Sequence, residues 1–286
     1  MMTNKLRKIR HYVLLYSIIV VVVVIVDFPV YWMIKTSLTT VDKVKTRDVK
    51  LGIHEFDVSS YVNVWNGTDY AARLEFRRYL YNSFVVVCIS SLISITLASL
   101  AGYSLARFRY KRRETIAQGV LYVYMFPQMI LTTPLLMLVI KFGLYDKLAS
   151  LVVVYCTFSL PYSIWMMRSY FSTLPKELEE AAMVDGCNRL QAIWNVMAPL
   201  ALPGIVATIT YSFIIGWSNV IYPLCFINSE SKKMISIGFL SLIAGDFTSW
   251  NGVMAAATLS SVPVVIVFLF LQKYLIGGLA VGGVKS

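Results

Sequence analysis

The residue types best suited to chemistry are concentrated in one short polar segment, 174–186. Its acidic and small members are Glu177, Glu179, Glu180, Ala181, Ala182, Asp185 and Gly186. Carboxylates are favoured near the N-terminus of a helix, where the helix dipole attracts negative charge. Pro175 suits a first helical turn, and Gly186 can adopt the left-handed conformation that ends a helix. The pattern therefore predicts a short charged helix made for recognition.

A second short helix is predicted to start at Asn188 and to be closed by Pro199. Its apolar positions fall on one face at helical spacing, and they are Leu190, Ile193 and Met197. On the first helix, one face is expected to carry Leu178, Ala181 and Ala182. Small residues on that face would let a partner approach closely. The two helices form a helix-turn-helix knuckle (177–197), although an amphipathic loop resting on lipid is the alternative that the residues leave open.

No catalytic motif accompanies the knuckle. The chain lacks the GxxxxGK[ST] phosphate loop, so we expect it to bind no ATP itself, and HExxH and GxSxG are also absent. The four cysteines have no CxxC-type spacing, and His11 and His54 are isolated, so no metal site is predicted. We therefore expect no enzymatic activity and no cofactor on this chain.

The composition indicates a membrane protein. Of the 286 residues, 58% are apolar and only 14% are charged, and the mean hydropathy is +0.68. A soluble domain would carry about 25% charged residues, so lipid must solvate much of this surface. The net charge of +11 lies in short basic clusters between apolar runs, as the positive-inside rule requires. This distribution argues against nucleic-acid binding.

The apolar runs predict an all-α membrane protein, with one transmembrane domain of about six spans over residues 1–286. The spans are 12–34, 84–106, 115–140, 148–170, 203–227 and 253–276, with a polar loop at 171–202. Basic clusters at 5–10 and 107–113 place that loop and both termini in the cytoplasm. Kinks are expected at Pro127 and Pro134, and a break at Pro161.

Two further features of the spans stand out. Ala98 and Gly102 are spaced for close helix packing in the second span. Asp27 is a rare charge within the first span, where it either serves a transport pathway or lies in the outer interface.

The knuckle also resembles a known signature. The run 180–186 (EAAMVDG), with Pro199 at the same spacing, closely resembles the EAA loop of binding-protein-dependent ABC importer permeases. One departure is Ala198, where a leucine usually precedes the proline. Other segments that resemble the maltose-type second permease of carbohydrate importers are 28–32, 36–38, 82–84, 101–108, 160–165 and 278–285. The segment 217–219 departs from the usual pattern.

The resemblance implies a set of partners in the bacterial plasma (inner) membrane. They are a second permease subunit, a dimer of ABC ATPases that binds ATP and Mg, an extracytoplasmic binding protein and a saccharide substrate. The ATPase would contact the EAA residues Glu180, Ala181, Ala182, Asp185, Gly186 and Pro199, and the tail Gly282, Gly283, Val284 and Lys285. The binding protein would contact the outer segment 228–251, through Phe239, Phe247 and Trp250.

A secondary, ion-coupled transporter of a small polar solute is the rival hypothesis. Such carriers need coupling-ion sites, often with acids inside the membrane or broken helices in paired repeats. This chain has prolines in its spans but few acids and no internal repeat. The ATP-driven importer is therefore favoured, and the sequence does not identify its sugar.

Overall fold

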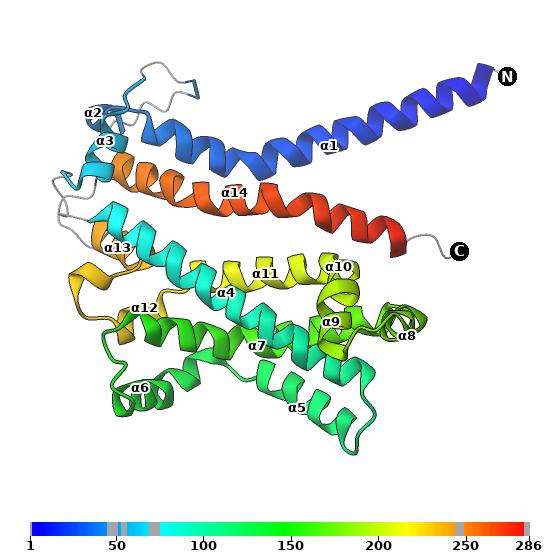
Figure 1. Cartoon of the computed structure of the whole chain (residues 1–286). Helices are drawn as coiled ribbons and strands as arrows, with labels where there is room; N and C mark the ends of the chain where they lie inside the picture. The colour runs from blue at the N-terminus through cyan, green and yellow to red at the C-terminus, as the bar shows by residue number, and fades with distance from the viewer. Residues whose placement is uncertain (1, 45–50, 53–55, 69–74, 244–248, 283–286) are drawn as a thin grey trace. The chain divides into compact units, whose positions relative to one another are not determined.

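The structure is a computed structural model that describes residues 2–44, 51–52, 56–68, 75–243 and 249–282 (Figure 1). Within these ranges it consists of helices and connecting turns, with no strand. The chain divides into two compact units, one of residues 1–74 and 241–260 and the other of residues 75–240 and 261–286. The all-α architecture predicted from the apolar runs is confirmed.

The first unit contains α1 (Met2–Ser37), α2 (Val41–Val44), α3 (Ser59–Asn66) and the first turns of α14 (Trp250–Gly282). Polar contacts hold its helix ends together. The hydroxyls of Ser37 and Tyr61 are 2.5 Å apart, and Asn251 Nδ2 donates to Ser60 Oγ over 2.9 Å. Every side chain from 10 to 31 is exposed, Asp27 included, as expected of a helix that needs lipid or another chain around it.

The second unit is built on three helices that lie side by side: α4 (Phe76–Arg107), α7 (Leu148–Thr173) and α11 (Leu202–Trp217) (Figure 1). Gly102 lets α4 approach α7, because a Cβ there would lie 2.7 Å from Met167 Cβ. The packing role predicted for Gly102 is thereby confirmed. Buried serines add a hydrogen bond between the same helices, with Ser94 Oγ 2.7 Å from Ser159 Oγ.

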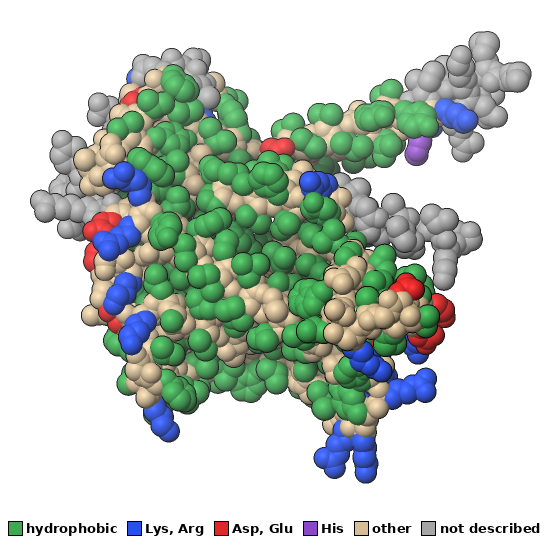
Figure 2. Space-filling model, viewed as in Figure 1, with side chains coloured by type: hydrophobic (Ala, Val, Ile, Leu, Met, Phe, Trp, Pro, Cys, Tyr) green, Lys and Arg blue, Asp and Glu red, His purple; other side chains and the backbone are tan. Residues whose placement is uncertain are grey.

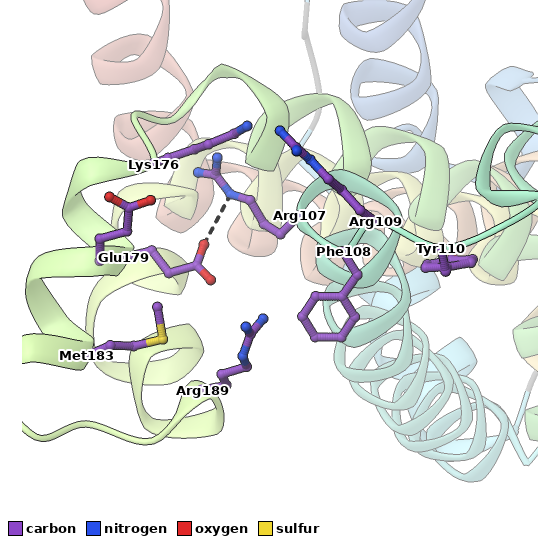
Figure 3. A pocket seen from close by; sticks show the side chains of 9 residues that line it. Arg107, Phe108, Arg109, Tyr110, Lys176, Glu179, Met183 and Arg189 are labelled. Carbon is purple, nitrogen blue, oxygen red and sulfur yellow. Dashed lines mark ion pairs between the residues drawn. The ribbon is translucent and has the colours of Figure 1, made fainter.

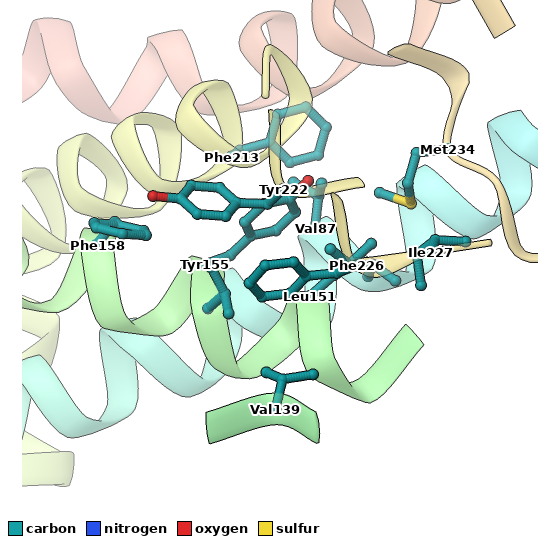
Figure 4. Packing of buried hydrophobic residues seen from close by; sticks show 12 residues of the cluster. Val87, Val139, Leu151, Tyr155, Phe158, Phe213, Tyr222, Phe226, Ile227 and Met234 are labelled. Carbon is teal, nitrogen blue, oxygen red and sulfur yellow. The ribbon is translucent and has the colours of Figure 1, made fainter. Parts of the chain in front are cut away.

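The apolar core of this unit lies where α12 (Ile221–Phe226) meets α4 and α7 (Figure 4). The rings of Phe158 and Tyr222 stack with their centroids 5.0 Å apart. Tyr222 also donates its hydroxyl to the carbonyl of Gln128 over 2.7 Å. This contact satisfies a carbonyl in a segment that has no regular α-helical partners.

Two helix pairs are sharply bent, one within the predicted third span and one across the boundary between the predicted loop 171–202 and the fifth span. In the third, α5 (Arg113–Tyr124) is followed at Pro127 by η1 (Gln128–Leu131) and α6 (Thr132–Lys141), with a bend of 89°. The other pair joins the segment Arg189–Leu200 to α11, with a bend of 82°. The fifth span is also interrupted, because α11 ends at Trp217 and α12 begins only at Ile221.

Four helices in the described parts of the chain are long and apolar enough to cross a membrane, and the bent pairs raise the number to six. The shorter helices not yet introduced are α8 (Glu177–Val184), α9 (Arg189–Ala192), η2 (Ile193–Met197), α10 (Ala198–Leu200), η3 (Glu230–Lys232) and α13 (Ile235–Ile243). Of these, α9, η2 and α10 make up the Arg189–Leu200 part of the second bent pair. Hydrophobic side chains cover much of the face seen in Figure 2. This surface suits a lipid environment.

Two expectations about prolines are wrong. Pro161 was expected to break the fourth span, but α7 is continuous through it; Pro161 is buried, and α7 packs against α4 and α11. Pro134 causes no kink within α6, since it lies in the first turn, where its missing N–H has no intrahelical partner to lose. Of the three prolines expected to kink or break a span, only Pro127 lies at a sharp bend.

Replacing Gly102 by alanine should destabilise the α4–α7 contact. The new Cβ would also lie 2.8 Å from the backbone nitrogen of Arg168, and no rotamer change can relieve that overlap. We expect a cost of about 1–3 kcal/mol, measured by thermal unfolding of the purified chain in detergent. Gly119→Ala in α5 is the matched control, because nothing lies within 4 Å of its Cβ, and it should be neutral or stabilising. Equal effects of the two changes would contradict the close approach.

Candidate functional site

The knuckle adopts the helix-turn-helix predicted from the sequence. The first helix, α8, ends where Gly186 takes φ +91°, and the N–H of Cys187 bonds to the carbonyl of Ala182 over 3.0 Å. The helix starts later than predicted, because Lys176 is its N-cap and Pro175 lies outside it. The positive φ at Gly186 makes this turn dependent on glycine.

The second helix of the knuckle starts at Asn188, as predicted. Asn188 Oδ1 accepts the N–H of Gln191 over 2.9 Å, and Gln191 Oε1 accepts the N–H of Asn188 over 2.8 Å. This reciprocal capping box fixes the helix start. Pro199 does not close the helix, since α10 continues to Leu200. The preceding turn, η2, is a π-helix, which accommodates a proline that lacks the usual donor.

The base of the knuckle is anchored by Glu179, a residue that the sequence analysis assigned only to the helix dipole. Arg107 Nε at the end of α4 lies 3.4 Å from Glu179 Oε2, and both side chains are less than a tenth exposed. Tyr103 donates its hydroxyl to the other carboxylate oxygen. Arg107 also donates to the carbonyl of Leu174 over 2.8 Å. Glu179 and Arg107 thus form a buried ion pair that ties the knuckle to α4.

Apolar packing strengthens the same attachment. Met197 and Ile193 of the knuckle are buried against Met167 and Phe171 of α7, and Tyr103 joins the cluster from α4. Of the three residues predicted on the apolar face, Ile193 and Met197 are buried as expected, whereas Leu190 is 56% exposed. The missed element was Arg107, for which the only signal was a basic residue at the end of an apolar run.

The opposite face of the knuckle is exposed. Its charged residues Glu180 and Asp185 lie beside Ala181, Leu178 and Val184, and Val184 is 86% exposed. Ala182 departs from the expected common face, because it is buried while Ala181 is not. The side chains of consecutive helical residues point in directions about 100° apart around the helix axis. Ala182 therefore faces the buried base of the knuckle, while Ala181 lies on its exposed face. The knuckle therefore combines a fixed base with an exposed surface.

A basic cleft of about 680 Å³ lies between the knuckle and the end of α4 (Figure 3). The charged side chains that line it are Arg107, Arg109, Lys176, Arg189, Glu179 and Glu180. Arg189 stacks its guanidinium over the ring of Phe108 at 5.1 Å. Cations outnumber carboxylates here, four to two, so the cleft favours an acidic neighbour.

The predicted tail is only partly described. Gly282 is the last residue of α14, which extends beyond the predicted span end at 276, while Gly283, Val284 and Lys285 lie outside the described residues. Of the predicted binding-protein contacts, Phe239 is half-buried on α13 and Trp250 is 50% exposed at the start of α14. Phe247 lies outside the described residues.

The outer segment begins with a clamp that the sequence analysis missed. Asp146 accepts the N–H groups of Asn228 and Ser229 over 3.0 and 2.8 Å, and Lys232 Nζ lies 3.0 Å from the same carboxylate. The hydrogen bonds from Ser229, with that from Lys232, hold the pKa of Asp146 well below its usual range. Asp146 is therefore charged at neutral pH. Sequence offers no signal for such a clamp, because its partners are more than 80 residues apart.

The α4 helix holds the rest of this outer segment. Tyr79 donates its hydroxyl to Glu230, and Asn82 Nδ2 donates to the carbonyl of Lys233 over 3.0 Å. The N–H of Ile235 donates to Ser83 Oγ over 2.8 Å. One end of α4 thus contacts the segment 230–235, and the other end contacts the knuckle.

Long apolar helices, bent spans and an exposed helix-turn-helix with a fixed base are features of a membrane permease. The chain belongs to the family of binding-protein-dependent transport system inner membrane components, whose family model matches residues 94–280. Members of this family are membrane subunits of ABC transporters, and the EAA motif and coupling helix belong to the family. The resemblance found in the sequence is confirmed.

Individual members of such transport systems are also similar to this chain in sequence or in fold. The chain is 33% identical over 263 residues to the inner membrane ABC transporter permease protein YcjP of Escherichia coli, covering 92% of each. It is 32% identical to the trehalose/maltose transport system permease protein MalG of Thermococcus litoralis, covering 93% of this chain and 94% of the relative. A bacterial ABC transporter involved in alginate import has the same fold, with a TM-score of 0.78, 21% identity and coverage of 93% and 96%.

Replacing Glu179 by glutamine should loosen the knuckle. The buried Arg107 would lose its counter-charge, and removing one partner of a buried pair costs about 3–5 kcal/mol. We expect faster backbone hydrogen exchange over residues 177–197, measured by mass spectrometry, and a lower unfolding temperature. Glu180→Gln is the control. Glu180 follows Glu179 on the same helix but is exposed, so its replacement should leave both the exchange rate and the unfolding temperature unchanged. Identical exchange in the two variants would contradict the anchoring role.

Proposed function

We propose that this chain is the permease subunit of an ATP-driven importer and forms the membrane pathway for a saccharide delivered by an extracytoplasmic binding protein. The single observation that carries the proposal is the knuckle, whose base is fixed by the Arg107–Glu179 pair while Glu180, Ala181 and Asp185 remain exposed. A surface that must transmit motion needs both properties. It must meet a partner, and it must not move independently of its own helices.

The driving force comes from a partner in this proposal. An ABC ATPase dimer binds ATP and Mg, and this chain binds neither. The ATPase contacts the exposed face of the knuckle, where Glu180 offers its charge, Ala181 permits close approach, and Gly186 sets the turn. Ala182 and Pro199 belong to the same loop, and Ala182 supports it from the buried side. The tail 282–285 adds a second ATPase contact.

The remaining partners follow from the family. A second permease completes the pathway, and the binding protein docks on the outer segment through Phe239, Phe247 and Trp250. The half-exposed Trp250 supports such a contact. Both termini and the knuckle face the cytoplasm, in agreement with the basic clusters at 5–10 and 107–113. The substrate is a saccharide, a class supported by the trehalose/maltose permease among the relatives.

Reconstitution of the complete complex in vesicles tests this function. With the cognate binding protein loaded with its sugar, we expect ATP hydrolysis to rise and sugar to accumulate inside. Uptake that needs an ion gradient and persists without ATP would contradict the proposal and favour the secondary carrier.

The Gly186→Ala variant should uncouple hydrolysis from uptake in the same vesicles. Its Cβ would meet no atom within 4 Å, so the cost is purely the positive φ, about 1–2 kcal/mol. A displaced turn would shift α8 relative to α9 and lower uptake per ATP hydrolysed. The matched control is Gly143→Ala, because Gly143 also has a positive φ, +65°, and open space around it but lies outside the knuckle. A similar loss in both variants would show that backbone strain alone, and not the knuckle, is responsible.

A further inference from the structure

Three tyrosines from three spans of the second unit form one aromatic cluster. Tyr162 of α7 and Tyr211 of α11 have ring centroids 3.9 Å apart, and Tyr124 at the end of α5 is 5.6 Å from Tyr162. Trp165, one turn along α7, lies 6.4 Å from Tyr162. Tyr124 and Trp165 are each 42% exposed, so the cluster reaches the surface of the unit.

The register of α7 against α11 brings the cluster together. Ser163 and Ser212, each the residue after a clustered tyrosine, are buried with their Oγ atoms 3.5 Å apart. Because consecutive residues differ by about 100° around a helix, Tyr162 and Tyr211 are directed to one side of this buried contact. The tyrosines are thus held by a packed interface and do not depend on a loop.

The cluster lies at an unusual depth for tyrosine. Tyr162 is 14 residues from the start of α7 and 11 from its end, or about 21 and 17 Å along the helix. Tyrosines in membrane proteins gather instead at the two interfaces, where the hydroxyl meets water. A group of phenol hydroxyls near the middle of three spans indicates polar surroundings at that depth.

The neighbouring interruption of the helix between α5 and η1 supports the same conclusion. α5 ends at Tyr124 and η1 begins at Gln128, and between them Met125 and Phe126 are 74% and 48% exposed. Irregular backbone at membrane depth does not face lipid, and it is tolerated only inside protein or beside a water-filled cavity. Transport proteins place substrate sites near the midplane beside such discontinuous helices. This face is therefore expected to meet either another protein chain or a water-filled pathway, and not lipid.

We propose that Tyr124, Tyr162, Trp165 and Tyr211 form a saccharide-contact site on the wall of the pathway contributed by this chain. The inference rests on the proposed function, which supplies the substrate class. The exposed rings offer stacking surface to the apolar C–H faces of a sugar, and the phenol hydroxyls offer hydrogen bonds to its rim. No cation or carboxylate belongs to these four side chains, so the site suits a neutral sugar.

Thiol labelling tests the water access that this site requires. Tyr124→Cys and Trp165→Cys are made separately in a chain whose four native cysteines are replaced by alanine, and each is assembled into the complex. The probe is methanethiosulfonate ethyltrimethylammonium, which reacts with thiolates in water. We expect labelling about tenfold faster than at Val153→Cys, since a thiol in lipid stays protonated. Val153 is the matched control on α7, because it is 52% exposed and nine residues from Tyr162, on the opposite side of the helix.

Sugar contact is tested in the same variants. The complex is trapped with ADP and vanadate in the presence of the binding protein, either as purified with its sugar or stripped of sugar by unfolding and refolding. We expect the sugar-loaded protein to slow labelling at both positions severalfold relative to the stripped protein. Two exposed positions are used so that failure of one variant to assemble leaves the other decisive.

Each outcome has a separate meaning. Labelling no faster than at Val153 would overturn the proposal, because lipid or the second permease would then cover the cluster. Rapid labelling that sugar does not slow would also overturn it, leaving a water-lined wall without a sugar site. Failure of the wild-type complex to couple ATP hydrolysis to uptake would instead refute the proposed function itself.

Discussion

The structure depends on α4 more than on any other helix of the second unit. Its 32 residues span about 48 Å, enough to cross a bilayer with both ends in the headgroup regions. Near one end Tyr79 and Asn82 hold the segment that follows α12, and at the other end Arg107 holds the knuckle. Gly102 lets α7 lie against this helix closely enough for the buried contacts to form. The single helix α4 thus holds both the knuckle, which precedes α11, and the segment 230–235, which follows α12.

The bent spans show how lipid limits where a backbone can break. An interrupted helix leaves N–H and C=O groups without intrahelical partners, and hydrocarbon cannot satisfy them. Nearby side chains satisfy some of these groups. Tyr222 donates its hydroxyl to the carbonyl of Gln128, and Asn219 Oδ1 accepts the N–H of Tyr222. The breaks in the third and fifth spans therefore support each other through one tyrosine. Continuous helices such as α4 and α7 need few such partners and serve as the scaffold.

Sequence reasoning succeeded where the governing physics is local. Apolar run length predicted an all-α chain with long apolar helices, and helix-end chemistry located the knuckle, with Gly186 at its turn and Asn188 at its second cap. It failed where tertiary contacts decide the outcome. The helix α7 continues through the buried Pro161, Ala182 is buried near Glu179, and Asp146 has hydrogen-bond partners far along the chain. The Arg107–Glu179 ion pair could not be predicted from the sequence either. A basic residue at the end of a span is normally explained by the positive-inside rule alone.

The buried ion pair has a physical consequence for the knuckle. An ion pair of this kind adds little net stability compared with apolar residues of the same shape, but losing either partner is costly. It therefore specifies position more than it stabilises the fold, because the carboxylate is satisfied only where Tyr103 and Arg107 both reach it. Apolar contacts such as Met197 on Phe171 tolerate sliding, whereas this geometry does not. A partner that pushes on the exposed face of α8 would then move α4 together with the knuckle, which is the mechanical requirement for coupling across the membrane.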